Sequence, residues 1–349
     1  MRILIVKLGS IGDIVHALPA LAAIRRSMPE AHISWAAERR SAEILRGNPM
    51  IDRLIEIDTR PLRGVSVDGM LRELRGQVSE LRQAKYDVAL DFQGLIKSAV
   101  VAKLSGAKKR WGFSGRALRE PASRILLTNA VRIPKETHIV RKNLLLAKGA
   151  LGVDIAAPPE FPIAVSHNHI EEAASVVARA GVRFAILNPG GGWITKLWDA
   201  ANYGSLADMI WQRLGMTSVI VSGPGEAALA GSTIAASRTG KVIPAQLSLK
   251  GFYTLAQQAA VYVGGDTGPT HIAVAAQTPI VGIFGPTEWW RNGSINANDI
   301  CVERNDIGCR ENCHRRTCSN WICMEIPVER VFDAVAARVT SAASPTVNA

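Results

Sequence analysis

A glycine-rich turn in the second half of the chain carries residue types suited to holding an anion. It follows a short apolar run ending at Gly264 and reads Gly265-Asp266-Thr267-Gly268-Pro269-Thr270-His271. Glycines let the backbone approach a ligand closely, and the first amides of the following helix have no intrahelical acceptor. Thr267 suits the N-cap of that helix and Pro269 its first turn. The turn predicts a phosphate site, with an ordinary strand–turn–helix junction around a buried His271 as the alternative.

A second glycine-rich loop, Asn188-Pro189-Gly190-Gly191-Gly192, follows another apolar run and leads to Lys196, which lies between Trp193 and Trp198. A lysine ammonium at this place could neutralise the charge on a diphosphate leaving group. The Gly-Lys-Ser/Thr order of a Walker loop is missing. The alternative is a surface lysine that lays its aliphatic stem over apolar neighbours.

The turn after the first apolar run, Gly9-Ser10-Ile11-Gly12-Asp13, occupies a position at which open α/β sheets bind ligands. Its spacing departs from the Gly-x-Gly-x-x-Gly dinucleotide fingerprint, which disfavours a dehydrogenase. Asp13 has two interpretations. It is either the N-cap of the next helix or a general base that deprotonates an attacking hydroxyl group.

Positive charge is concentrated in the first half of the chain. Residues 1–150 hold 27 Lys and Arg against 14 Asp and Glu, and residues 151–349 hold 14 against 16. Such a field attracts nucleic acid, an anionic membrane face or an acidic substrate, although a surface kept soluble by arginine would show it too. Aromatic residues are sparse here and no nucleic-acid-binding motif accompanies the charge, which favours an anionic acceptor. The basic residues singled out are Arg60, Arg63, Lys97, Arg116, Arg119, Arg141 and Lys108–Arg110.

All five cysteines lie in one short stretch: Cys301, Cys309, Cys313, Cys318 and Cys323. An odd number without a secretion signal argues against a disulfide framework. The spacing of the last four could place thiolates around a structural zinc or iron, although paired Cys-x2-Cys knuckles are missing. A metal site and a cluster of reduced thiols both stay open.

Apolar runs alternate with helical patterns along the whole chain, which is typical of parallel sheets with crossover helices. The expected strands are Ile3–Val6, His32–Ala36, Arg53–Ile57, Val88–Asp91, Lys109–Gly112, Phe184–Asn188, Thr217–Ser222, Tyr262–Gly264 and Ile280–Phe284. The expected helices are Ile14–Met28, Ser41–Arg46, Val67–Gln83, Ile96–Ser105, Ile139–Leu151, Ile170–Arg179, Ala200–Leu214, Glu226–Ser237, Phe252–Ala259 and Thr270–Ala276.

We therefore predict an α/β protein with two Rossmann-like parallel-sheet domains facing a central cleft, because 349 residues exceed what one core usually supports. The boundaries are an N-terminal domain at 1–155, a proline-containing linker at 156–165, a C-terminal domain at 166–325, and a final helix with a small-residue tail at 326–349. No apolar run is long enough to span a bilayer, and Met1–Lys7 resembles a strand rather than a signal peptide. We expect a cytoplasmic protein.

Taken together and in this order, the motifs resemble glycosyltransferase family 9, the ADP-heptose:lipopolysaccharide heptosyltransferases. The resemblance extends from Arg2 to about Val339. It is carried by Ile5–Leu21, Asp91–Ala99, Lys196–Trp198 and Gly265–His271. The middle of the first domain, with Arg60, Arg63 and Arg119-Glu120-Pro121, is most similar to the heptosyltransferase I subgroup, which adds the first heptose to the Kdo sugar of the inner core.

The resemblance implies a GT-B fold and an inverting displacement that requires no metal or other cofactor. Asp13 matches the general base and Lys196 the lysine that steadies the diphosphate, so both are assigned as catalytic. Residues assigned to the ADP-heptose donor are Ser10, Gly12, Lys196, Glu226, Asp266, Thr267, Gly268 and His271. Residues assigned to the acidic acceptor are Arg60, Arg63, Gln93, Lys97 and Arg119.

The partners implied are ADP-heptose and Kdo-lipid A, with no nucleic acid, and the location implied is the cytoplasmic face of the inner membrane. Three alternatives are carried forward. One is a family 9 enzyme for another sugar position, similar to heptosyltransferase II. The others, from different classes, are a non-catalytic anion- or nucleic-acid-binding protein and a nucleotide-sugar epimerase or dehydrogenase.

Overall fold

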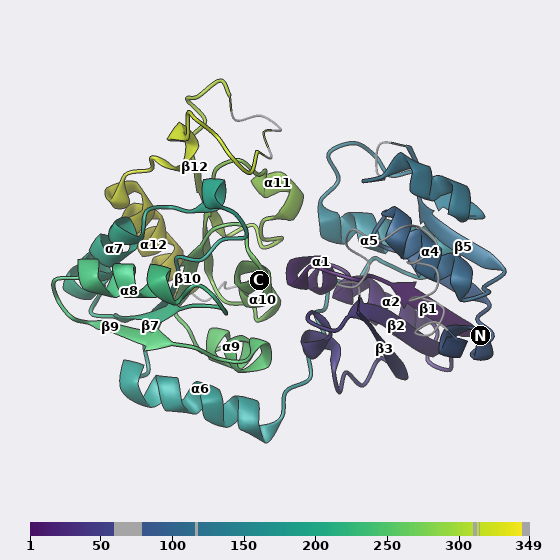
Figure 1. Ribbon diagram of the computed structural model, residues 1–349. Coiled ribbons are helices and arrows are strands. Elements are labelled where there is room, and N and C mark those ends of the chain that lie inside the picture. Colours follow the sequence, from purple (N-terminus) through teal and green to yellow (C-terminus); the bar gives the residue numbers. More distant parts are fainter. Residues whose placement is uncertain (59–78, 116–117, 310–312, 314, 344–349) are drawn as a thin grey trace, which may run out of the picture. The chain divides into compact units, whose positions relative to one another are not determined.

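The computed structural model describes residues 1–58, 79–115, 118–309, 313 and 315–343 (Figure 1). It divides into two compact units, Met1–Ala164 and Val165–Ala349. Each unit is built on its own six-stranded sheet, and every strand pairing in both sheets is parallel. The α/β class predicted from the sequence is confirmed.

The sheet of the first unit has the strand order β3-β2-β1-β4-β5-β6. Strand β1 lies beside both β2 and β4, and Val6 at its carboxyl end pairs with Asp91 at the end of β4. The order reverses at β1, which is the kind of position where open α/β sheets bind ligands. The strands are β1 (Arg2–Val6), β2 (His32–Glu38), β3 (Arg53–Ile57), β4 (Val88–Asp91), β5 (Lys109–Phe113) and β6 (Asn129–Val131).

Helices and short 3-10 turns connect these strands. They are α1 (Ile11–Val15), α2 (Leu18–Ser27), η1 (Ala42–Leu45), α4 (Ile96–Leu104), η4 (Pro121–Leu126) and α5 (Ile139–Leu151). The single helix predicted over Ile14–Met28 is wrong, because Pro19 lies in the first turn of α2 and cannot donate to a preceding turn. Most of the predicted helix Val67–Gln83 lies outside the described residues.

The sheet of the second unit has the order β12-β11-β10-β7-β8-β9. If β7 is taken as the first strand of this sheet, the strand order is the same as in the first unit. The order reverses at β7, as it does at β1. Gly264 at the end of β10 pairs with Asn188 at the end of β7, so the two glycine-rich turns begin side by side. The strands are β7 (Phe184–Asn188), β8 (Thr217–Val221), β9 (Val242–Ala245), β10 (Val261–Gly264), β11 (Ile280–Phe284) and β12 (Ile300–Glu303).

The helices of the second unit cover both faces of this sheet (Figure 1). Helices α7, α8 and α12 pack together, as do α6, α9 and α10. Apolar side chains of α7 and α12 form one core cluster with those of β7, β10 and β11. The elements are α6 (His167–Ala180), η5 (Ile194–Lys196), α7 (Ala200–Leu214), α8 (Ala227–Ala236), α9 (Leu249–Ala256), α10 (Gly268–Ala275), α11 (Trp289–Asn292), η6 (Ile322–Met324) and α12 (Val328–Ala343).

Local sequence signals explain why α7 begins and ends where it does. The Asp199 carboxylate accepts a hydrogen bond from the Ala201 amide at 2.9 Å, which caps the first turn. At the other end, Gly215 takes a left-handed conformation with φ of 64°, which favours glycine. The predicted helix Ala200–Leu214 is therefore confirmed at both ends.

Three strands, β6, β9 and β12, were not predicted, and each forms an edge of its sheet. Edge strands are short and half exposed, so their apolar pattern is weak. Strand β9 also contains Pro244, which is tolerated at an edge because no neighbour needs its missing amide hydrogen. In the part of the chain that the structure describes, no helix is both long and apolar enough to cross a bilayer.

Candidate functional site

Asp13 lies on the turn that follows β1, where it caps the start of α1. Its Oδ2 accepts a hydrogen bond from the Ser10 amide at 3.0 Å. Ser10 is the N-cap residue and Asp13 is the third residue of the helix, so the alternative of Asp13 as N-cap is wrong. Ser10 is exposed and Gly12 buried, and both lie on the same turn as Asp13. One carboxylate oxygen, Oδ1, takes no part in this cap.

Two cations approach the Asp13 carboxylate. The ammonium of Lys7 lies 3.4 Å from Oδ1, and the guanidinium of Arg119 lies 3.6 Å from Oδ2. Burial acts to raise the pKa of Asp13, but Lys7, Arg119 and the Ser10 amide outweigh it and lower the pKa to about 2. Asp13 is therefore an ionised carboxylate, able to accept a proton, throughout the neutral range.

Lys7 is a site residue that sequence reasoning did not assign. Its side chain is 3% exposed, and its ammonium also donates to the Phe92 carbonyl at 2.9 Å. The available signal was a charged residue directly after the apolar run Ile3–Val6, at the carboxyl end of a strand. A buried lysine at such a place needs a partner, and Asp13 supplies it.

The predicted acceptor residues in the described part of the first unit lie on or near the loop after β4. Gln93 is buried, and the Lys97 ammonium forms an ion pair with the buried carboxylate of Glu38 at 2.7 Å. Arg119 reaches Asp13, as described above. Arg60 and Arg63 lie outside the described residues.

Asp91 ends β4 and holds that loop in shape. Its Oδ1 accepts hydrogen bonds from the amides of Gln93 and Gly94 at 2.9 and 3.1 Å, and its Oδ2 accepts one from Ser98 Oγ at 3.1 Å. Complete burial raises the pKa of Asp91 to about 6, opposed by these hydrogen bonds. These hydrogen bonds are to its own loop and helix, so we interpret its role as shaping the loop.

In the second unit, Lys196, Asp266 and His271 come together. The Lys196 ammonium donates to Asp266 Oδ2 at 2.6 Å and to the Asp266 carbonyl at 2.9 Å. His271 Nε2 lies 3.2 Å from Asp266 Oδ1. The three side chains are between 7% and 9% exposed, so the alternative of Lys196 as a surface lysine is wrong.

The charges of this cluster stabilise one another. Burial acts to raise the pKa of Asp266, but the hydrogen bond from His271 and the charge of Lys196 hold it well below its usual range. Asn292, at the end of α11, adds a hydrogen bond to Asp266 Oδ2 at 3.2 Å. Asn292 is a second site residue that the sequence did not reveal, because only the tertiary fold brings α11 to this turn.

Hydrogen bonds among buried side chains hold the turn between β10 and α10 in place. Asn188 donates to the Tyr262 hydroxyl at 2.9 Å and to Thr267 Oγ1 at 3.2 Å, and Thr270 donates to the Gly265 carbonyl. Thr267 is the N-cap residue of α10 by position, but its hydroxyl bonds to the side chains of Asn188 and Thr270 rather than to a backbone amide of the helix. Thr267 has an extended backbone, and the first amides of α10 after it have no acceptor within the helix, as an anion site requires.

Glu226 joins the two loops that follow β7 and β8. Its Oε2 accepts a hydrogen bond from the Gly223 amide at 2.8 Å. Its carboxylate also lies so close to Gly190 that a Cβ on this glycine would collide with it. Gly190 is therefore needed for close approach, which places Glu226 beside the loop that leads to Lys196.

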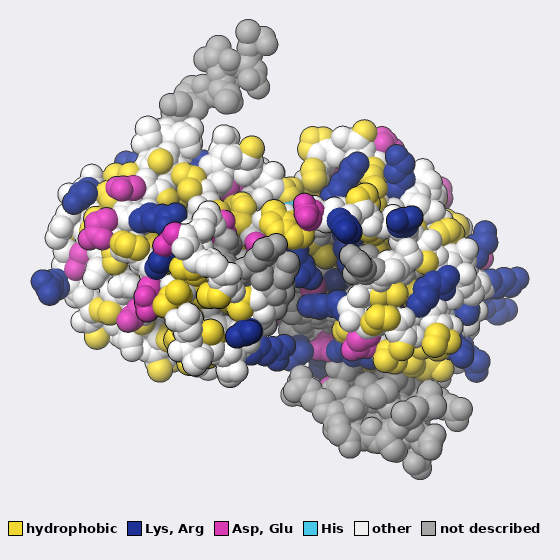
Figure 2. All heavy atoms as spheres, turned by 90° about the horizontal axis from the view of Figure 1, so that it is seen from above, with side chains coloured by type: hydrophobic (Ala, Val, Ile, Leu, Met, Phe, Trp, Pro, Cys, Tyr) yellow, Lys and Arg dark blue, Asp and Glu magenta, His cyan; other side chains and the backbone are white. Residues whose placement is uncertain are grey.

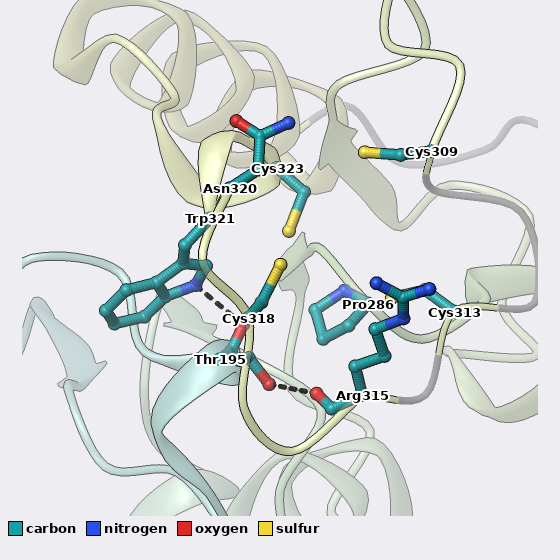
Figure 3. Close-up of a pocket in the computed structure, with 9 residues that line it drawn as sticks. All are labelled: Thr195, Pro286, Cys309, Cys313, Arg315, Cys318, Asn320, Trp321 and Cys323. Atoms are coloured by element: carbon teal, nitrogen blue, oxygen red, sulfur yellow. Dashed lines mark hydrogen bonds between the residues drawn. The ribbon is translucent and has the colours of Figure 1, made fainter.

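The four cysteines whose spacing suggested a metal line a single pocket (Figure 3). Figure 3 shows the sulfur atoms of Cys318 and Cys323 pointing toward one another. Burial raises the pKa of the Cys323 thiol, and the neighbouring cysteines raise it further. Among the described residues, no three His, Cys, Asp or Glu side chains form a metal ligand set. The possible zinc or iron at Cys309, Cys313, Cys318 and Cys323 is thus not supported.

The surface of the first unit carries the basic excess of the chain. Figure 2 shows Lys and Arg side chains over much of the visible face of this unit, interspersed with hydrophobic side chains. Part of this charge is paired, as in the Arg46–Glu56 and Arg25–Asp52 ion pairs at 2.7 Å. The unit remains cationic overall.

Solved structures of heptosyltransferases share this fold. The E. coli heptosyltransferase WaaC with ADP-2-deoxy-2-fluoro heptose matches 98% of this chain and 100% of its own, with a TM-score of 0.74 and 22% identity. The E. coli ADP-heptose lps heptosyltransferase II matches 99% of this chain and 100% of its own, with a TM-score of 0.78 and 20% identity. The two parallel sheets are those of the GT-B glycosyltransferase fold.

Sequence comparison identifies the family. The profile of Glycosyltransferase family 9 (heptosyltransferase) matches residues 76–322. Lipopolysaccharide heptosyltransferase 1 of Pseudomonas aeruginosa is 29% identical over 321 residues, which cover 91% of this chain and 88% of that protein. The chain belongs to glycosyltransferase family 9 and is a glycosyltransferase, as its motifs predicted.

Proposed function

We propose that this enzyme transfers heptose from ADP-L-glycero-D-manno-heptose to a Kdo residue of the lipopolysaccharide inner core. The observation that carries the proposal is the buried Lys196–Asp266–His271 cluster beside the start of α10, in a family 9 chain. The E. coli WaaC complex with ADP-2-deoxy-2-fluoro heptose supports the donor, and the name of the P. aeruginosa relative, lipopolysaccharide heptosyltransferase 1, supports lipopolysaccharide as the acceptor class.

The donor is assigned to residues 166–325. Lys196 neutralises charge on the diphosphate, and the amides of Thr267 and Gly268 bind its phosphate oxygens. Glu226 binds the adenosine ribose, because a carboxylate accepts hydrogen bonds from vicinal hydroxyl groups. Asp266 binds heptose hydroxyl groups, with His271 holding the Asp266 carboxylate in place. Ser10 and Gly12, on the turn of the first unit that bears Asp13, are also assigned to the donor.

Asp13 is the proposed general base of an inverting displacement. Its carboxylate takes the proton from the acceptor hydroxyl as the oxygen attacks the anomeric carbon, and the bond to ADP breaks on the opposite face. The reaction needs positioned reactants, a base and charge stabilisation on the leaving group, and we assign no cofactor to it.

The acceptor is assigned to residues 1–155, with residues 156–165 as the linker. Lys97, Arg119 and Gln93 offer donors to the Kdo carboxylate or to lipid A phosphates, and Arg60 and Arg63 are assigned to the same role. Since the acceptor is a lipid, we propose that the enzyme works as a peripheral protein at the cytoplasmic face of the inner membrane. Nucleic acid is not a proposed partner.

Nucleotide preference tests the donor. Calorimetry against ADP, UDP and GDP should give tightest binding of ADP, followed by transfer from ADP-heptose to a Kdo-containing acceptor. A preference for UDP would overturn the heptose assignment and leave the family unchanged. Transfer only to an acceptor that already carries heptose would instead indicate a later position in the core.

Replacing Asp13 tests the base. We expect Asp13→Ala to lower kcat by roughly 10²–10⁴-fold, as for a lost general base, with ADP affinity unchanged. Single-turnover transfer and calorimetry separate the two effects. Asp91→Ala is not a suitable control because it reshapes a loop, so Asp87→Ala, on the loop before β4, serves instead. Near-normal turnover by Asp13→Ala would refute the assignment.

A further inference from the structure

The segment Arg315–Trp321, which contains Cys318, is hydrogen-bonded to the short turn that carries Lys196. Thr195 is 2% exposed, and its hydroxyl donates to the Arg315 carbonyl. The Thr195 carbonyl accepts a hydrogen bond from the indole of Trp321 at 3.0 Å. Figure 3 shows both hydrogen bonds reaching Thr195 from the same segment, at the edge of the cysteine-lined pocket.

A neighbouring ring makes a third connection. The Lys196 ammonium lies 3.8 Å from the centroid of the Trp193 ring, and the Arg316 guanidinium carbon lies 5.4 Å from the same centroid. The Trp193 ring thus contacts both Lys196 of the donor site and Arg316 of the segment Arg315–Trp321. Cation–π contacts of this kind orient both partners.

Asp266 holds the ammonium of Lys196, and the hydrogen bonds to Thr195 hold the backbone of the turn. Element η5 is a single 3-10 turn of three residues, closed by the amides of Lys196 and Leu197. Such turns are weak by themselves, and this one follows the glycine loop Gly190–Gly192. Ile194 within it is 56% exposed and adds little packing. External anchors must therefore set the position of the Lys196 backbone.

We propose that Thr195 and Trp321 are positioning residues of the donor site, through which the segment Arg315–Trp321 holds Lys196 in place for the donor diphosphate. The proposal rests on the role proposed above for Lys196. Thr195 is anchored on both its hydroxyl and its carbonyl, so the preceding and following residues cannot shift without breaking a hydrogen bond. Thr195, Arg315 and Trp321 also line the pocket that the four cysteines line.

The first test removes the Thr195 hydroxyl. We expect Thr195→Val to weaken ADP binding and to raise the KM for ADP-heptose, each by about 3- to 10-fold, the effect of one lost hydrogen bond. The KM for the acceptor should not change. Thr195→Ser restores the hydroxyl and should restore both values. Thr278→Val is the matched control, because Thr278 is equally buried and donates to the Ala256 carbonyl at 2.7 Å, on another part of the unit.

The second test removes only the indole hydrogen. Trp321→Phe keeps an aromatic ring but deletes the donor to Thr195, and we expect a similar loss of ADP affinity. It also keeps the proposal testable if Thr195→Val fails to fold. Unchanged ADP affinity in the folded variants, or a loss in Thr278→Val of the same size, would overturn the proposal.

Lys196→Met distinguishes this inference from the proposed function. If wild-type enzyme binds ADP and Lys196→Met binds it as well, the role of Lys196 is wrong. If Lys196→Met loses affinity while Thr195→Val and Trp321→Phe do not, Lys196 keeps its role and the positioning inference fails.

Discussion

Each unit of this enzyme pairs a lysine with an aspartate at the carboxyl edge of its sheet. Lys7 faces Asp13 in the first unit, and Lys196 binds Asp266 in the second. In both pairs the positive charge outweighs burial and keeps the carboxylate ionised. Asp91 shows the opposite case, since burial raises its pKa to about 6. The charge of Lys7 also acts on Asp91, so the balance between burial and the surrounding charges and hydrogen bonds decides the pKa at each position.

The Lys7–Asp13 pair predicts a pH effect. In Lys7→Met, we expect the pKa of Asp13 to rise by about 1–3 units, because the opposite charge that lowers it is lost. Activity should then fall as pH decreases through the acid range, where the wild-type base stays ionised. The measurement is kcat/KM between about pH 4 and pH 8, with Lys103→Met, an exposed lysine at the end of α4, as control. Identical profiles for Lys7→Met and wild type would contradict the pairing.

The free energy of unfolding, like the activity, should fall as the pH is lowered. The pKa of Asp13 is lower in the folded protein than its usual 3.8, so its ionised form stabilises the fold above that pH. This contribution is lost as pH falls toward about 2. Lys7→Met should remove much of this contribution, because it leaves the partly exposed Asp13 carboxylate without its nearest cation, and acid unfolding of the two proteins would measure the loss.

At the scale of elements, the site depends on loops that approach one another closely. The loop after β7 lies against Glu226 at the start of α8, with Gly190 at the contact. The loop after β10 is supported by Asn188 from β7. The parallel register that pairs Gly264 with Asn188 brings these loops together, so the site is a consequence of strand order.

The contact at Gly190 can be tested with a neighbouring glycine as control. Gly190→Ala would displace the Glu226 carboxylate, which is the flexible end of its side chain, so the free energy of unfolding should change little. If Glu226 binds the ribose, ADP affinity should fall about tenfold. Gly192→Ala meets open space and should change neither value. Denaturant unfolding and calorimetry give the two measurements, and equal ADP affinity of the two variants would contradict the contact.

At the scale of the whole molecule, the two units have the same strand topology but different net charge. The two units share one strand order, but residues 1–150 carry the entire basic excess while residues 151–349 are slightly acidic. The shared topology provides a ligand-binding edge in each unit. The charge makes the first of them attractive to an acidic acceptor.

This asymmetry predicts how the two substrates respond to salt. Raising the ionic strength from about 0.05 M to about 0.5 M shortens the range of electrostatic attraction from more than 10 Å to a few ångströms. The KM for the acceptor should rise more steeply than the KM for ADP-heptose, as transfer kinetics at each salt concentration would reveal. Generic DNA should give no gel shift. Equal salt dependence of both KM values would count against an acceptor site in the basic unit.

The sequence by itself determined the class of fold, most of the strands and helices, the family, and the residues of the glycine turns. These are local signals, since an apolar run, a capping residue or a glycine acts on its own neighbourhood. Only the tertiary structure decided the edge strands β6, β9 and β12 and the partners Asn292 and Trp321. Each of these depends on a contact between residues distant in the chain, such as Trp321 with Thr195, and periodicity and spacing do not encode such a contact.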